Sequence, residues 1–386
     1  MQALIKHARA NGLVPIVAGN YGRNDYTATE YGYVQRINAL LNGWAVPTVN
    51  LLGAVDDLSG NGRYTTGYWW DALHPNDAGH AEMAHAIVPS LPDALAAAKA
   101  QPRRRVSAGI TLRNTATAHA PTVRLVPEDV VHPFTTALRF RTAGTGRLVE
   151  VRDSAGLSAG TVQVAANCRL LYTSAKGRTI AGTKLVNDNR WHKLVLTHYY
   201  GRGLTRLYVD SLYEGAANER LRPTRLDLGG SAAPARVQLR DFFFYRSGMN
   251  EGEILTMAAD SLLKSSLELY APLDGSRTVA TDSLTNLAQS LNTLSRLATP
   301  LATRESTRSA AINLYPNPST GEVTLQAARS LEGTPVQLYD ALGRAVLTAT
   351  IRQSRLNVGA LAPGLYSLQF ELEGETVRKR LVRQAD

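Results

Sequence analysis

The hydrophobic periodicity of the chain changes near residue 100, and this change limits the folds that the chain can adopt. Before it, apolar spacing predicts two short strands, over Leu13–Gly19 and Val46–Leu52, and two helices, over Tyr31–Leu41 and Asp77–Ile87. Strands that alternate with helices form a parallel sheet with helices on both faces. Residues 1–100 are therefore predicted to form an α/β segment.

After a basic linker over residues 101–109, apolar and polar residues alternate strictly in short runs. This spacing, with a turn about every ten residues, predicts an antiparallel β-sandwich over residues 110–275. Residues 276–308 are rich in Ser, Thr, Leu and Ala and are interpreted as a second linker. Residues 309–386 again contain short strands between glycine turns, which predicts a small C-terminal β-sandwich. The chain is therefore expected to be a multidomain protein.

Composition excludes several classes of protein. The chain has 386 residues, of which 44% are hydrophobic and 19% charged, as in globular proteins. The net charge is +10, but no basic stripe interleaved with aromatic residues is visible, so nucleic acid is not an expected partner. No apolar run reaches the roughly 18 residues of a membrane span. Cys168 is the single cysteine, so no internal disulfide can form.

The run Asp71-Ala-Leu-His74-Pro-Asn-Asp-Ala-Gly-His80 carries the strongest chemical signal. In acyl transfer, a histidine takes the proton of a serine hydroxyl while a carboxylate holds the imidazole in the right tautomer. Asp71 and His74 on one tight loop could place both groups above the C-terminal edge of a parallel sheet, where such sheets hold their sites. The alternative is structural: Asp71 caps a turn, and His74 packs under Tyr68–Trp70.

This run resembles the last conserved block of the SGNH (GDSL-type) hydrolases, which are serine esterases and lipases of flavodoxin-like fold. The resemblance covers residues 1–95, and it implies that Asp71 is the triad carboxylate and His74 the general base. Two departures accompany it. The Gly-Asp-Ser nucleophile turn of that family normally precedes the point where this chain starts, and Ser59 and Ser90 lie outside any strand–turn–helix elbow.

We therefore expect a segment of SGNH hydrolase lineage that is N-terminally truncated, lacks the nucleophile serine and is inactive as it stands. Gly22-Arg-Asn-Asp25 spells the asparagine block of the family but follows the wrong strand, so it is treated as a chance match. His74, His80 and His85 do not have the spacing of helical zinc ligands, so neither a metal ion nor another cofactor is expected.

The middle of the chain resembles the laminin-G and concanavalin-A-like jelly rolls through Asp188-Asn-Arg-Trp191-His-Lys-Leu-Val and Arg206-Leu-Tyr-Val-Asp210. The resemblance implies a domain that binds glycans or proteins, with calcium in some members. No calcium-loop spacing is visible, and Trp191 is assigned to packing rather than to a ligand. Polysaccharide is accordingly a candidate partner of this domain.

The C-terminal segment resembles the sorting domain of the type IX secretion system of Bacteroidetes. The resemblance rests on Leu314-Tyr-Pro-Asn-Pro-Ser-Thr-Gly321, Leu338-Tyr-Asp-Ala-Leu-Gly-Arg344 and Leu361-Ala-Pro-Gly-Leu-Tyr366. It implies that residues 309–386 bind the secretion machinery and that the protein is secreted or attached to the cell surface. No signal peptide is visible after Met1, which we interpret as further evidence of a missing N-terminal part.

Two functions of different classes remain open from sequence. One is an exported ester hydrolase, for carbohydrate or other acyl esters, with a polysaccharide-binding jelly roll. The other is a non-catalytic surface protein that binds glycans or proteins, in which the hydrolase segment only packs against the jelly roll.

Overall fold

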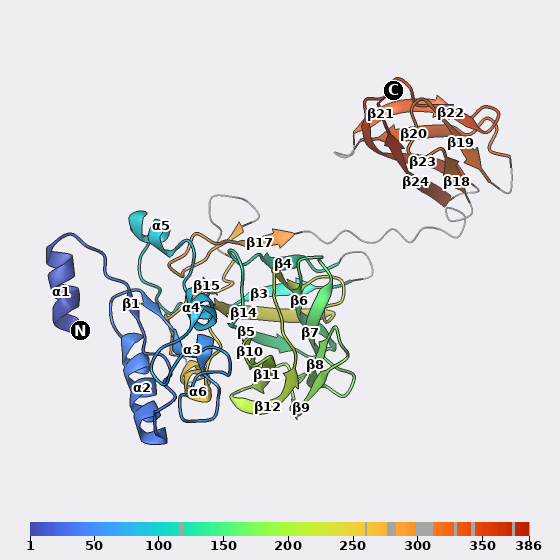
Figure 1. Ribbon diagram of the computed structural model, residues 1–386. Coiled ribbons are helices and arrows are strands. Elements are labelled where there is room, and N and C mark those ends of the chain that lie inside the picture. The colour runs from blue at the N-terminus through green and yellow to red at the C-terminus, as the bar shows by residue number, and fades with distance from the viewer. Residues whose placement is uncertain are drawn as a thin grey trace. The chain divides into compact units, whose positions relative to one another are not determined.

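The computed structural model of the protein describes residues 1–115, 119–258, 261–275, 283–297, 312–327, 330–340, 344–372 and 375–385. The chain divides into two compact units, residues 1–301 and 302–386 (Figure 1). None of the helices in these described ranges combines the length and the apolar character that a membrane span needs.

Five helices and a pair of short parallel strands form the N-terminal part of the first unit. They are α1 (Gln2–Ala10), β1 (Val17–Ala18), α2 (Ala28–Leu41), β2 (Thr48–Val49), α3 (Leu52–Val55), α4 (Asp77–Ala84) and α5 (Leu91–Ala96). Helix α2 begins at a capping box, in which the Thr27 side chain accepts the N–H of Glu30 and the Glu30 carboxylate accepts the N–H of Thr27. Both predicted strands are present, but each is only two residues long.

An antiparallel β-sandwich follows, as the alternating spacing predicts. One sheet has seven strands, in the order β12-β11-β10-β5-β14-β15 with β3 also paired to β14, and the other has eight, in the order β16-β17-β4-β13-β6-β7-β8-β9. The first sheet contains β3 (Ile110–Arg113), β5 (Phe134–Thr142), β10 (His192–Tyr199), β11 (Leu204–Val209), β12 (Leu212–Asn218), β14 (Arg236–Tyr245) and β15 (Leu267–Ala271). The second contains β4 (Thr122–Leu125), β6 (Gly146–Arg152), β7 (Ser158–Val164), β8 (Arg169–Ser174), β9 (Thr179–Leu185), β13 (Arg225–Gly229), β16 (Ser283–Leu284) and β17 (Leu294–Leu297).

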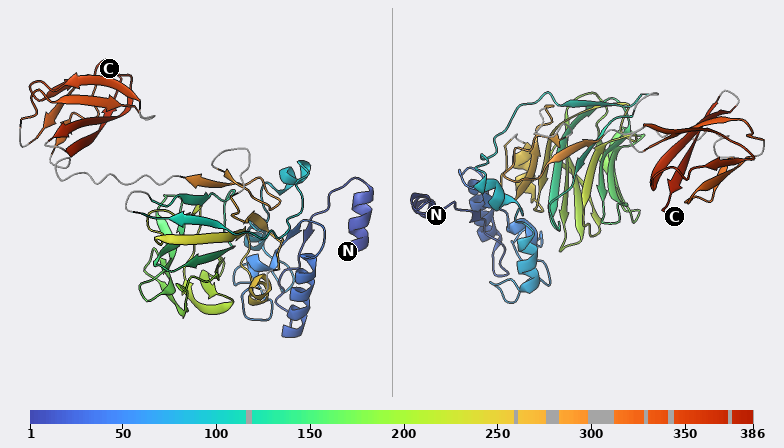
Figure 2. Two further views of the ribbon diagram at one scale, coloured as in Figure 1. Left: turned by 180° about the vertical axis from the view of Figure 1, so that it is seen from behind. Right: turned by 90° about the horizontal axis from the view of Figure 1, so that it is seen from above.

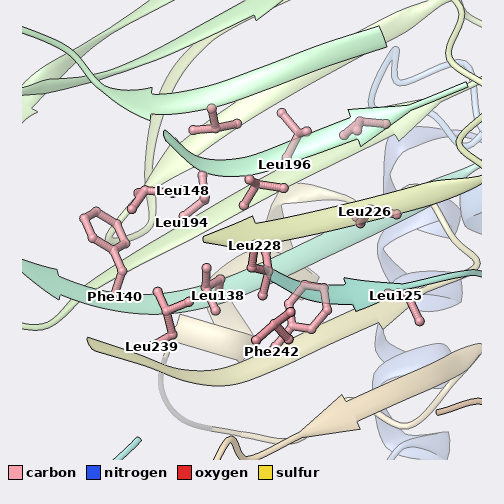
Figure 3. Packing of buried hydrophobic residues seen from close by; sticks show 14 of the residues in the cluster. Leu125, Leu138, Phe140, Leu148, Leu194, Leu196, Leu226, Leu228, Leu239 and Phe242 are labelled. Atoms are coloured by element: carbon pink, nitrogen blue, oxygen red, sulfur yellow. The ribbon is translucent and has the colours of Figure 1, made fainter. Parts of the chain in front are cut away.

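The main hydrophobic core lies between these two sheets. Leu138 and Leu194 enter it from the seven-stranded sheet, and Leu226 and Leu228 enter it from the eight-stranded sheet (Figure 3). All four side chains are at most 1% exposed. Because side chains alternate along a strand, the residues next to these leucines in sequence point to the outer face of each sheet.

Residues 276–308 were predicted to be a linker, but part of this stretch belongs to the sandwich. Strand β17 pairs with β4, and β16 pairs with β17, so residues 283–297 belong to the eight-stranded sheet. Leu284 and Leu294 are almost fully buried in the core, which explains why this Ser- and Thr-rich stretch forms strands. Residues 276–282 and 298–308 of the predicted linker lie outside the described residues.

The second unit is a small all-β body. One sheet has the order β18-β19-β22 and the other β21-β20-β23-β24, around a core of their inward-facing apolar residues. The strands are β18 (Asn313–Tyr315), β19 (Glu322–Gln326), β20 (Pro335–Tyr339), β21 (Ala345–Thr350), β22 (Arg355–Asn357), β23 (Gly364–Leu372) and β24 (Glu375–Arg383).

The N-terminal part packs on the outer face of the seven-stranded sheet, next to α6 (Glu251–Ala258) (Figure 2). Hydrogen bonds join the N-terminal part to α6 and to the segment before β15. The N–H of Ser266 donates to the carbonyl of Thr48 at 3.0 Å, and the Asn50 side chain donates to Glu253 of α6 at 2.7 Å. Burial raises the pKa of Glu253 to about 7. The sandwich therefore provides much of the surface against which the short parallel strands are ordered.

Arg246 is the central polar residue of this junction, and its side chain is only 1% exposed. Its guanidinium group lies 2.8 Å from the Glu268 carboxylate and donates to the carbonyl of His85, just after α4, at 2.8 Å. It also donates to the carbonyls of Glu128 and Val130. One buried arginine thus links the N-terminal part, the loop before β5 and strand β15.

We predict that Arg246→Met destabilises the first unit by about 3–5 kcal/mol, because it leaves the buried Glu268 carboxylate without its cation. The double variant Arg246→Met/Glu268→Met should lose less, since it leaves no buried charge unpaired. All four tryptophans lie in residues 1–301, so tryptophan fluorescence during urea unfolding reports this unit alone. The exposed Arg169→Met is the control. A double variant no more stable than the single one would contradict the prediction.

Candidate active site

A tight loop between residues 67 and 76 holds the two predicted catalytic residues. The N–H of Trp70 donates to the carbonyl of His74 at 2.9 Å, and this bond closes the loop. At its end, Asn76 caps α4 by accepting the N–H of Gly79, and its amide donates to the carbonyl of Gly67 at 3.0 Å. The helix start and the loop are therefore fixed by the same asparagine.

Asp71 and His74 contact each other directly within this loop. The imidazole Nδ1 lies 2.9 Å from Oδ2 of Asp71, and the N–H groups of Leu73 and His74 donate to Oδ1 at 2.8 and 2.7 Å. The imidazole hydrogen bond, followed by the two backbone N–H groups, lowers the pKa of Asp71 to about 2. An ionised carboxylate beside Nδ1 accepts a hydrogen bond from Nδ1–H, and in the neutral ring of this tautomer the basic lone pair is on Nε2.

Both side chains are exposed to solvent, 63% for His74 and 50% for Asp71. Among the residues that the structure describes, Asp71 is the one side chain that hydrogen-bonds the His74 ring. The hydroxyl of Ser90 donates to Glu128 at 2.6 Å, and Ser59 lies in a turn where its N–H donates to Asp57. Neither serine makes a hydrogen bond to the imidazole.

Asn24 and Tyr64 hold the loop from the side, and sequence reasoning missed both. The N–H of Asn24 donates to the carbonyl of Ala72 at 2.8 Å, and the Tyr64 hydroxyl donates to the carbonyl of Leu73 at 2.9 Å. Asn24 also accepts the N–H of Tyr64 at 3.1 Å. Asn24 belongs to the segment treated above as a chance motif, and it follows β1 just as the Asp71 loop follows β2. Its position beside the loop could have been inferred from that parallel order.

The far side of α4 is joined to the sandwich by a second group of residues that the sequence did not reveal. Glu82, 3% exposed, lies 2.8 Å from Nδ1 of His132, and the His132 ring stacks on Tyr200 with centroids 3.9 Å apart. The ring of His85 lies 4.2 Å from that of His132. Burial and the nearby His132 lower the pKa of His85. These contacts fix the helix that begins directly after His74.

A different buried histidine lies in the sandwich, at the start of β10. His192 sits between Asp188, 2.9 Å from its Nε2, and Asp210, 2.8 Å from its Nδ1. These hydrogen bonds raise the pKa of His192. Both ring nitrogens are occupied, so this histidine has no free nitrogen to act as a base. Within the described ranges, no group of three or more His, Cys, Asp or Glu residues is arranged to hold a metal ion.

Comparison with known families identifies one part of the chain. Residues 313–384 match the family described as the secretion system C-terminal sorting domain. The second unit is therefore a type IX secretion sorting domain, and the match supports export of the protein to the cell surface or beyond. In sequence, none of the curated proteins matches the chain.

Similar solved structures resemble the chain only distantly. A candidate carbohydrate-binding protein from Bacteroides ovatus is 13% identical, with 50% of this chain and 61% of that chain covered and a TM-score of 0.36. Domains LG4-5 of the mouse laminin alpha1 chain are 13% identical over 74% and 82% of the two chains, with a TM-score of 0.31. The heptameric SAP-like pentraxin of Limulus polyphemus is 12% identical over 38% and 80%, with a TM-score of 0.32. Similarities at this level carry no inference about function.

We predict that His74→Ala raises the pKa of Asp71 from about 2 toward its ordinary value of 3.8, because the imidazole makes the largest contribution to the lowering. The rise should be incomplete, since the backbone N–H groups of residues 73 and 74 still donate to the carboxylate. Carboxyl-carbon NMR titration measures both values. Asp25, whose pKa is lowered by Arg23, serves as the internal control and should not change. An Asp71 that titrates identically in both proteins would show that the two side chains do not pair in solution.

Proposed function

We propose that the protein is an exported surface protein of the serine ester hydrolase lineage. In this proposal, Asp71 and His74 are the carboxylate and the general base of an ester-cleaving site of SGNH type, and the β-sandwich binds the polysaccharide that carries the ester. The export part of the proposal follows from the sorting domain.

The orientation of the His74 ring is the observation that carries the catalytic part. Its Nδ1 is held by Asp71 at 2.9 Å, so its Nε2 is the nitrogen available to take a proton. A histidine in this tautomer can deprotonate a hydroxyl and return the proton to the leaving alkoxide, while the carboxylate stabilises the imidazolium that forms between the two steps.

The surroundings of the loop support the same proposal. The segment containing Asn24 follows the C-terminal end of the parallel strand β1, and the N–H of Asn24 donates to the carbonyl of Ala72 in the loop at 2.8 Å, so the loop adjoins the segment that leaves this strand. Open parallel sheets hold their ligands at this edge. The ring of Tyr68, on the same loop, lies so close to Gly201 that a Cβ there would come within 2.4 Å of it. The loop therefore borders the sandwich, which suits an ester carried on a bound polysaccharide.

Ester cleavage also needs a nucleophile within reach of Nε2. Among the described residues, no hydroxyl group makes a hydrogen bond to that nitrogen. We therefore expect this chain to hydrolyse p-nitrophenyl acetate no faster than its His74→Ala variant, because removal of the nucleophile from such a triad typically costs several orders of magnitude in rate.

A chimera tests the roles of Asp71 and His74 directly. The strand–turn–helix block that carries the Gly-Asp-Ser serine of an SGNH hydrolase is fused ahead of Met1, and hydrolysis of p-nitrophenyl acetate is measured. We expect a rate that falls by about 10³-fold or more with His74→Ala and also falls with Asp71→Asn. His80→Ala, on the next helix, is the matched control and should leave the rate unchanged.

Two outcomes would contradict the proposal. A folded chimera whose rate does not depend on His74 would show that the pair is not a catalytic base. A His74-dependent rate in the unmodified chain would instead show that it already contains a nucleophile, and would overturn the expectation of inactivity.

The second candidate function is non-catalytic binding at the cell surface. The exposure of His74 without a hydroxyl partner favours it, because a complete triad encloses its base between nucleophile and carboxylate. In this case the Asp71–His74 pair only orders the loop before α4. The chimera separates the two candidates, since only the hydrolase proposal predicts a His74-dependent rate there.

A further inference from the structure

A cavity of about 290 Å³ opens at one end of the sandwich, where the turns after β6 and β8 meet the ends of β10 and β12. We call it the Tyr200 cavity. The charged and aromatic residues that line it are Asp153, Lys176, Tyr200, Glu219, Arg220 and Arg222. Small-molecule pockets in proteins enclose about 300–1,000 Å³, so this cavity suits a ligand of about the size of a single sugar ring.

Tyr200 is held firmly at the wall of this cavity. Its ring stacks on that of His132 with centroids 3.9 Å apart, and its hydroxyl accepts the Nε–H of Arg222 at 2.8 Å. Arg220 is anchored at the same point, because its Nε–H donates to the carbonyl of Tyr200 at 3.3 Å. Among the residues that the structure describes, Arg222 makes this one hydrogen bond, so its terminal N–H groups remain available as donors.

Glu219 is a buried acceptor among these donors. It is 8% exposed, its Oε1 accepts the hydroxyl of Tyr172, and its N–H donates to the carbonyl of Gly203 at 2.8 Å. Within the described ranges, no second donor and no cation contacts this carboxylate. A carboxylate buried to this extent needs further hydrogen bonds to offset the loss of water. Because Glu219 lines the cavity, a hydroxyl group bound there can supply one.

The lining of the cavity combines donors with acceptors, and this combination favours an uncharged ligand. A sugar hydroxyl both donates and accepts, so neighbouring hydroxyls of one ring can donate to Glu219 and accept from Arg222. A carboxylate or sulfate group can only accept, and it would bring its negative charge close to Glu219 and Asp153. Backbone N–H groups of its own turn hold Asp153 in place.

The cavity lies next to the loop over residues 67–76 that contains the candidate catalytic pair. Gly201 directly follows Tyr200, and a Cβ at Gly201 would come within 2.4 Å of the ring of Tyr68 on that loop. Nδ1 of His132, on which Tyr200 stacks, lies 2.8 Å from a carboxylate of α4, the helix that begins directly after the loop. A ligand in the cavity is therefore held beside the candidate active site.

We propose that the Tyr200 cavity binds a neutral sugar unit of a polysaccharide through hydrogen bonds from its hydroxyl groups to Glu219 and Arg222. The inference rests on the proposed role of the sandwich in polysaccharide binding. It adds the position of the site and the absence of charge on the sugar. A polysaccharide bound at this position has its neighbouring units close to the loop that carries His74.

The test measures binding of the full chain to glucomannan, arabinoxylan and dextran, which are neutral, and to polygalacturonate, which is acidic, by affinity electrophoresis and calorimetry. We expect binding to at least one neutral polymer, with a change of less than about twofold as salt rises, because an uncharged ligand has no charge to be screened.

Two variants locate the site. Glu219→Gln keeps an acceptor for the Tyr172 hydroxyl but removes the carboxylate, and Arg222→Gln removes the guanidinium donors. Each should weaken binding to the neutral polymer by about tenfold or more, as expected for loss of a hydrogen bond to a charged group. Arg169→Gln, an exposed arginine of β8 outside the cavity, is the matched control and should bind as the unmodified chain does. Tryptophan fluorescence confirms that each variant is folded, and the exposed Arg222 allows the test even where Glu219→Gln is unstable.

The outcomes separate this inference from the proposed function. Binding to a neutral polymer that survives both variants would show that the site lies elsewhere and would leave polysaccharide binding intact. Binding to polygalacturonate alone would show that the ligand is not neutral. Binding to none of the four polymers would overturn both the inference and the polysaccharide part of the proposed function. The catalytic part stands or falls separately with the chimera, whose substrate contains no sugar.

Discussion

The buried ion pair between Arg246 and Glu268 is the contact on which the arrangement of the first unit depends. A two-stranded parallel sheet with β-strands of two residues has too few backbone bonds and too little buried surface to be stable alone. Here the N–H of Ser266 donates to the carbonyl of Thr48 in β2, and Arg246 fixes the surrounding junction by donating to the carbonyl after α4, to two carbonyls of the loop before β5 and to β15. Desolvating an ion pair is costly, so this one is better explained by its ability to fix several backbone segments together than by its own attraction.

The parts of the fold that could be predicted from sequence are those that local spacing determines. Alternation of apolar and polar residues predicted the strands around Phe140, Val149 and Leu207. A half-buried strand shows this two-residue alternation whatever the rest of the chain does. The strands at Leu284 and Leu294 were not predicted, because two apolar residues in a Ser- and Thr-rich stretch show no periodic spacing. Their burial depends on a sheet edge formed by residues far away in the chain, which no local pattern contains.

The candidate site also contains residues that the local sequence suggests and residues that only the fold brings together. Asp71 and His74 are three residues apart, so one tight turn brings them together and the sequence alone suggests the pair. Asn24 reaches the same loop from nearly fifty residues earlier, through a backbone bond to Ala72 that depends on parallel strand order. Glu82 and His132 meet across the junction with the sandwich. The sequence therefore identifies the reacting groups of such a site more readily than the residues that hold them in place.

Strand register can carry information that composition hides. In sequence, Arg139, Lys193 and Arg240 each occupy the polar position of an ordinary alternating strand, and each taken alone is an unremarkable surface residue. Pairing puts them side by side, so their effect on stability is a property of the fold and not of any one strand.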